Sequence, residues 1–113
     1  MTINGVEFDI DATDADFIER YELKYKEVEE QINELDNKKD TISAVKGIRQ
    51  ECKIIKDFLD YVLGEGASEK IFKGKDSLKL CINAFEDIIN NVDKQHREMQ
   101  ETFEKYSPER LKR

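Results

Sequence analysis

The side chains best able to act in catalysis are one histidine, His96, and two cysteines, Cys52 and Cys81. A nucleophilic cysteine needs a neighbouring base or positive charge that lowers its pKa. Both cysteines lie instead among apolar residues at helical spacing, where we expect buried, reduced and inert thiols. His96 lies in the polar stretch 93–98 and is expected to be solvated. The sequence therefore predicts no catalytic residue and a protein that is not an enzyme.

Two stretches have the composition of binding loops but not their spacing. The acidic run Asp9, Asp11, Asp14 and Asp16 lacks the spacing, the central glycine and the final glutamate of a calcium loop. Gly64–Gly66 follows a predicted helix, and no Gly-Lys-Ser/Thr comes after it, so a helix stop is predicted rather than a phosphate loop. Two thiols alone cannot complete a zinc site. We expect no metal and no cofactor.

The composition favours long amphipathic helices with wide solvated faces. The 113 residues suit one domain, 1–113, and 40% of them are charged while 38% are hydrophobic. Apolar surface left over on such a molecule would be covered by a partner. No apolar run approaches the roughly 20 residues of a membrane-spanning helix, and residues 1–5 do not have the pattern of a signal peptide. We therefore expect no membrane contact and a cytoplasmic location.

The net charge of −7 is concentrated in the N-terminal third. Residues 1–36 contain twelve acidic and three basic residues, or −9, whereas residues 37–74 carry +2 and residues 75–113 are balanced. General nucleic-acid binding needs a positive surface that displaces counterions, so direct nucleic-acid binding is not expected. An acidic face favours a basic partner, or imitation of nucleic acid.

Residues 1–10 alternate between apolar and polar side chains in the manner of a strand, and Asn4-Gly5 is a strong signal for a tight turn. We expect a short β-hairpin that packs on the helices or pairs with another chain, because a two-stranded ribbon is marginally stable alone. Its expected apolar face consists of Val6, Phe8 and Ile10.

Three long amphipathic helices are predicted over residues 15–35, 42–63 and 78–106, where apolar side chains recur every three or four positions. The apolar stripe of the third helix is dense through Val92 and then thins, so its last part is expected to project from the core. Together with the hairpin and one short helical turn, these helices define a mainly α fold.

Capping residues and helix stops set the expected boundaries. Gly64–Gly66 ends the second helix, Ser68–Phe72 forms the short turn, and Pro108 ends the third helix before a basic tail, 107–113. The predicted capping positions, in order along the chain, are 11–14, Asp40 or Thr41, and Asp76 or Ser77.

Two surfaces are candidate partner-binding sites. The first is an acidic face of the first helix, which is an ordinary solvated face or a docking site for a basic partner. The second lies on the last turns of the third helix and either packs back on the first helix or binds a partner or second copy. The acidic residues are Glu27, Glu29, Glu30 and Glu34. The apolar residues are Met99, Phe103 and Tyr106.

Three stretches carry a family resemblance: residues 3–10 (INGVEFDI) with Asp14–Asp16 and Tyr21, residues 58–75 (FLDYVLGEGASEKIFKGK), and residues 105–113 (KYSPERLKR). Their order resembles a family of small acidic proteins of bacteriophages and prophages of Gram-positive bacteria, of unassigned activity. The chain departs from that pattern at positions 10, 12 and 13, which affects only hairpin packing.

The resemblance implies a virion-assembly or accessory protein, similar to tail assembly chaperones, which bind the tape-measure protein or tail-tube subunits. An alternative is a phage inhibitor of a host defence system, anti-CRISPR-like, whose acidic face occupies a nucleic-acid channel. A third is a homo-oligomeric structural component that buries the apolar end of the third helix against itself. The partner and the oligomeric state stay open.

Overall fold

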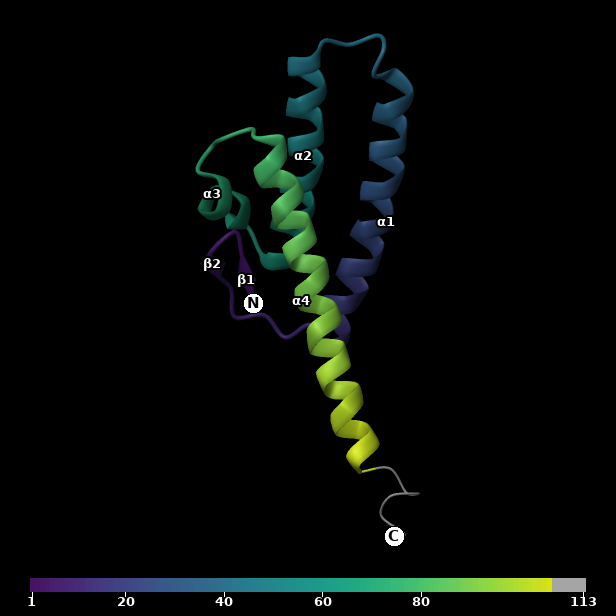
Figure 1. Ribbon diagram of the computed structural model, residues 1–113, viewed down its shortest axis with the longest axis vertical. Helices are drawn as coiled ribbons and strands as arrows, with labels where there is room; N and C mark the ends of the chain where they lie inside the picture. Colours follow the sequence, from purple (N-terminus) through teal and green to yellow (C-terminus); the bar gives the residue numbers. More distant parts are fainter. Residues whose placement is uncertain (107–113) are drawn as a thin grey trace.

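The computed structural model describes residues 1–106, and these contain four helices and one two-stranded sheet (Figure 1). The mainly α class is therefore confirmed. The predicted basic tail, 107–113, lies outside the described residues, whereas the third helix, predicted to run to residue 106, ends at Lys105 with Tyr106 as its C-cap. The elements in chain order are β1 (Thr2–Ile3), β2 (Val6–Glu7), α1 (Ala15–Lys38), α2 (Ala44–Leu63), α3 (Ala67–Phe72) and α4 (Leu78–Lys105).

The connection between α1 and α2 is shorter than predicted and lies further along the chain. Helix α1 continues past residue 35 to Lys38, whose positive charge suits a helix C-terminus. The predicted cap of α2 at Asp40 or Thr41 is wrong. Ser43 caps that helix by accepting a 3.2 Å hydrogen bond from the amide of Lys46. The hydroxyl of Thr41 instead donates to the Lys38 carbonyl at 2.7 Å and closes the end of α1.

The remaining N-caps show how side chains stabilise the starts of the other helices. Asp14 accepts from the amide of Phe17 at 3.1 Å, and Ser77 accepts from Leu80 at the start of α4. Helix α3 begins at Gly66 without a side-chain cap of its own. Its first turn is capped from a neighbouring element instead.

That cap is supplied by Asp60 of α2. Its carboxylate accepts hydrogen bonds from the amide of Ser68 at 2.7 Å and from the Ser68 hydroxyl at 2.8 Å. A carboxylate that satisfies free N–H groups in a first turn stabilises a short helix and complements its dipole. The position of α3 is thus tied to α2.

The hairpin is tighter than expected. Thr2 pairs with Glu7 and Ile3 with Val6, and the φ angles of Asn4 and Gly5 are +47° and +81°. Positive φ at both central positions is the requirement of a type I′ turn, which Asn-Gly meets at least cost. The assigned strand ends at Glu7, although Phe8 still exchanges two hydrogen bonds with Met1, at 2.7 and 2.8 Å. The predicted strand over residues 9 and 10 is wrong, since the chain leaves the ladder there and runs along α4. Val6, Phe8 and Ile10 are nevertheless partly buried against the core.

The core lies where α1, α2 and α4 meet, with α3 and the hairpin closing one side (Figure 1). Tyr21, Tyr25, Phe58 and Phe85 form an aromatic cluster whose adjacent ring centroids are 5.3–5.9 Å apart. Offset and edge-to-face pairs at such distances add to the stability gained by burial. Burial also raises the pKa of Tyr21 to about 12.

The three long helices are staggered along the 64 Å axis of the molecule. The α1–α2 hairpin extends beyond the first residue of α4 at one end, and α4 extends beyond the hairpin at the other (Figure 1). Only the middle of the molecule is therefore a three-helix arrangement.

Candidate functional site

The last third of α4 leaves the core after Val92. Val92 is 3% exposed, whereas every side chain from His96 to Tyr106 is exposed. The predicted apolar residues Met99, Phe103 and Tyr106 are 44%, 73% and 69% exposed. The structure therefore places them on a projecting helix and not against α1. Their spacing of four and three residues puts them in one stripe, called here the α4 stripe.

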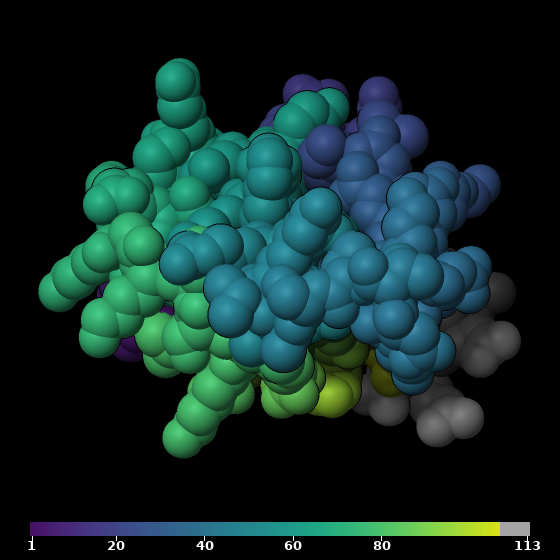
Figure 2. Space-filling view, turned by 90° about the horizontal axis from the view of Figure 1, so that it is seen from above, coloured from purple at the N-terminus to yellow at the C-terminus, as the bar shows by residue number. Residues whose placement is uncertain are grey.

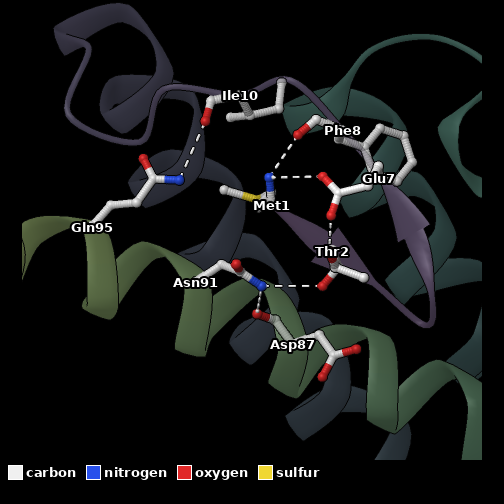
Figure 3. Close-up of polar contacts among 8 residues, drawn as sticks. All are labelled: Met1, Thr2, Glu7, Phe8, Ile10, Asp87, Asn91 and Gln95. Atoms are coloured by element: carbon white, nitrogen blue, oxygen red, sulfur yellow. Dashed lines mark hydrogen bonds and ion pairs between the residues drawn. The ribbon is translucent and has the colours of Figure 1, made fainter.

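A row of polar side chains on α4 holds the N-terminal segment at the base of this projection (Figure 3). Asp87 accepts from the amide of Asn4 at 2.9 Å, and Asn91 donates to the Thr2 carbonyl at 3.1 Å. Gln95 donates to the Ile10 carbonyl at 3.3 Å. These residues follow one another at intervals of four, so they share one face of the helix.

The segment after the hairpin is held at the same place. The amide of Ala12 donates to Gln95 at 2.8 Å, and Nε2 of His96 lies 2.6 Å from the Ala12 carbonyl oxygen. Since a carbonyl only accepts, His96 donates from Nε2. His96 was predicted to be simply solvated. Its ring is exposed, but it also anchors the chain that enters α1.

The four glutamates of the acidic face do not form one continuous patch. Glu29 borders a hollow shared with α4, beside Asp93, whereas Glu34 borders the α1–α2 side, beside Lys53. Glu27 pairs with Lys24 at 2.8 Å. Glu29, Glu30 and Glu34 are exposed. The helical spacing groups Glu27, Glu30 and Glu34, while Glu29 points elsewhere.

An apolar groove that the sequence did not reveal runs along the α1–α2 hairpin. It begins as a hollow of about 370 Å³ between α1 and α4 and continues past Leu78 toward the α1–α2 loop. Its floor and walls are mostly aliphatic, with Asp36 and Glu51 as acidic residues. We call this surface the hairpin groove. Its aliphatic and aromatic residues are Val28, Ile32, Leu35, Ile42, Ile48, Ile55, Leu78, Ile82 and Phe85.

The two cysteines lie side by side in the core as free thiols. Cys52 of α2 and Cys81 of α4 are both completely buried. Burial, together with the neighbouring Cys52 thiol, raises the pKa of Cys81 to about 12. A thiol with such a pKa is protonated at neutral pH and is a poor nucleophile.

Residues 1–106 contain no group of three or more side chains positioned to hold a metal ion. Within the same residues, the helices are too short or too polar for any of them to cross a bilayer.

The acidic positions and the α4 stripe could be named from helical spacing, whereas the groove and the polar row could not. The groove depends on where one helix ends relative to another. The only sequence sign of the polar row is that Asp87, Asn91 and Gln95 follow one another at intervals of four beside the apolar stripe of α4.

The fold and these surfaces define a small, elongated helical protein whose N-terminal hairpin is fastened to its last helix. The chain belongs to DUF6673, a family of unknown function, whose model matches residues 4–113. No curated protein and no solved structure matches the chain.

Proposed function

We propose that this protein acts by protein–protein contact, as a bacteriophage or prophage tail assembly chaperone or a related morphogenesis factor in the bacterial cytoplasm. The observation that supports the proposal is the α4 stripe. Phe103 and Tyr106 are large apolar side chains exposed on a helix that projects from the core. Aromatic and methionine side chains are enriched at protein interfaces, where a few buried residues, often tyrosine, supply most of the binding energy.

The chemistry of the stripe favours an amphipathic helix as partner. A helix binds a helical stripe through apolar residues at intervals of three and four, which is the periodicity of a long helical tape-measure protein. The outer face of the projection carries charged side chains of both signs, including Arg97, Glu101 and Glu104. They would keep a complex soluble while the partner's apolar residues are shielded.

Co-expression with a tape-measure protein tests the proposal. We expect the gene of this protein to lie just upstream of a gene for a long helical tape-measure protein, and the probe is that gene's product, purified through a tag. We expect the untagged protein to co-purify and the double variant Met99→Glu, Phe103→Glu to be lost. Leu23→Glu is the matched control, because Leu23 is 56% exposed on a different element.

Co-purification that survives the double variant, or that is lost equally in the Leu23 control, would contradict a role for the α4 stripe. The acidic face is tested separately with Glu27, Glu29, Glu30 and Glu34 changed to lysine. If binding persists unchanged at low salt, these charges take no part in it.

A further inference from the structure

The exposed apolar surface of the described chain is concentrated at two ends of the molecule. Among its large hydrophobic side chains that are exposed, three form the α4 stripe: Met99, Phe103 and Tyr106. Ile48 and Ile82 line the hairpin groove, at 37% and 46% exposed. Val45, 63% exposed, lies one turn before Ile48 on α2. Five of the eight such side chains thus belong to the stripe or the groove.

The two surfaces are complementary in kind. The first half of α4 packs on the α1–α2 hairpin through residues at intervals of three and four, ending at Val92. Met99 follows seven residues later, so the stripe continues the same face of the helix after the hairpin has ended. The α1–α2 hairpin continues past Leu78, the first residue of α4, and no third helix packs on it there. Each surface lacks what the other supplies.

The lengths also agree. Residues 93–105 of α4 and the C-cap Tyr106 span about 20 Å at a rise of 1.5 Å per residue. The groove follows α2 from Ala44 to Ile55, a distance of roughly 17 Å on the same rise. Figure 2 views the molecule from the groove end, with the blue residues of the α1–α2 loop nearest the viewer and the green start of α4 beside them.

Uncharged side chains flank the stripe on the helix: Gln95, Gln100 and Thr102 lie three or four positions from Met99 or Phe103. The acidic side chains of Asp11 and Glu98 border a hollow beside Met99, at the base of the projection. A helix that enters the groove from the loop end with its C-terminus leading would point toward the N-terminus of the resident α4. The two helix dipoles would then be aligned head to tail, which is favourable.

We propose that this protein associates with itself head to tail, with residues 93–106 of one copy seated in the hairpin groove of the next. The contact joins two different surfaces, so it is heterologous and builds a ring or an open chain and not a symmetric dimer. The proposal goes beyond the function argued above and does not depend on the identity of the partner. Because both use the α4 stripe, self-association would compete with partner binding.

Sedimentation velocity of the untagged, purified protein tests the proposal without any partner. We expect the average mass to rise with concentration above the 13.3 kDa of one chain. The stripe variant Met99→Glu, Phe103→Glu and the groove variant Ile48→Glu, Ile82→Glu should each weaken association by about tenfold or more. Leu23→Glu should leave it unchanged. Circular dichroism and the urea midpoint show that each variant is folded.

Mixing the two variants gives the decisive result. The stripe variant retains a working groove and the groove variant retains a working stripe, so an equimolar mixture should form a dimer with one copy of each and stop there. If Ile48→Glu unfolds the chain, Ile82→Glu alone replaces the double variant, because Ile82 is the more exposed of the two.

Three results would overturn head-to-tail association. The first is a wild-type protein that stays monomeric at concentrations of several hundred micromolar. The second is a mixture of variants that remains monomeric. The third is association lost through the stripe variant alone, which would indicate stripe-to-stripe pairing. None of these three results depends on whether the protein co-purifies with a tape-measure protein. The two proposals can therefore be refuted independently.

Discussion

The amide of Ala12 donates a 2.8 Å hydrogen bond to the side-chain oxygen of Gln95, 83 positions further along the chain. Ala12 is completely buried, and the same Gln95 side chain donates to the carbonyl of Ile10. One amide side chain therefore satisfies a donor and an acceptor of a segment without regular structure. This bond joins the entry of α1 to the point where α4 leaves the core.

Replacing Gln95 by alanine is expected to lower the free energy of unfolding by about 1–3 kcal/mol, because the buried amide of Ala12 loses its acceptor. Gln100→Ala is the matched control, since Gln100 is exposed on the projecting part of the same helix. Urea denaturation measures the difference, and amide hydrogen exchange at Ala12 locates it. Equal losses in both variants would contradict the anchoring role of Gln95.

Removal of the Asp60 carboxylate should destabilise α3 specifically. Asp60→Ala is expected to cost about 1–2 kcal/mol, the usual cost of losing a helix cap. Asp57→Ala should cost much less, because Asp57 is exposed and, within residues 1–106, pairs only with Lys53 in a surface ion pair. A double-mutant cycle with Ser68→Ala should show that the two losses are not additive. Additive losses would mean that Asp60 stabilises the fold in another way.

Asp76 should make stability depend on pH in the acid range. Its carboxylate pairs with Lys56 at 2.7 Å and Arg49 at 2.9 Å. These bonds, the one from Lys56 foremost, lower the pKa of Asp76 below its ordinary value of 3.8. A lowered native pKa means that the contribution is complete above about pH 4 and is lost as the pH falls through the native pKa.

The variant Asp76→Asn should therefore be less stable than wild type at pH 7, and the difference should shrink steadily below pH 4. Guanidinium titrations from pH 7 to pH 2 measure it. A difference between the two proteins that stays constant down to pH 2 would show that the carboxylate charge is irrelevant.

The paired thiols should resist alkylation in the folded protein. At pH 8 a thiol with a pKa of 9.0 has about a tenth of its molecules as thiolate, whereas a pKa of about 12 reduces that fraction roughly a thousandfold for Cys81. Burial adds a barrier to access. Iodoacetamide labelling followed by mass spectrometry should give almost no adduct in buffer and two adducts in denaturant. Rapid labelling of Cys81 in buffer would show that the α2–α4 interface opens.

The aromatic residues of the core and of the projection should differ sharply in their effect on stability. Phe58 is completely buried, and Phe58→Ala is expected to cost about 3–5 kcal/mol. Phe103→Ala should change stability by about 0.5 kcal/mol or less in dilute solution, because that ring is 73% exposed. Thermal denaturation at low protein concentration compares them. A large loss for Phe103→Ala in the monomer would mean that the helix end packs on its own chain.

Local chemistry made much of the fold predictable. The Asn4-Gly5 turn, the cap at Asp14 and the long apolar stripes depend on neighbours within four residues, so they can be read from spacing. The α2 start was misplaced because Asp40, Thr41 and Ser43 are all good capping residues, and local sequence does not decide among them.

The surfaces were less predictable because they depend on distant parts of the chain. Spacing shows that Met99 and Phe103 share a face of the helix. It does not show that the α1–α2 hairpin ends before the level of these two residues. The hydrogen bond from Asn91 to the Thr2 carbonyl joins positions 89 apart, and nothing within four residues of either position announces it. The hairpin groove exists only because the α1–α2 hairpin extends beyond the first residue of α4.

The attachment of the N-terminal β-hairpin to α4 has a consequence for the order in which the protein folds. Ile3 is completely buried, yet the side chains that hold its neighbours, Asp87, Asn91 and Gln95, are synthesised after almost everything else described. Residues 1–12 can therefore reach their final place only after residues 87–95 have been made. Until then the apolar side chains of residues 1–10 stay exposed to solvent. Contacts between residues so far apart in the chain form slowly.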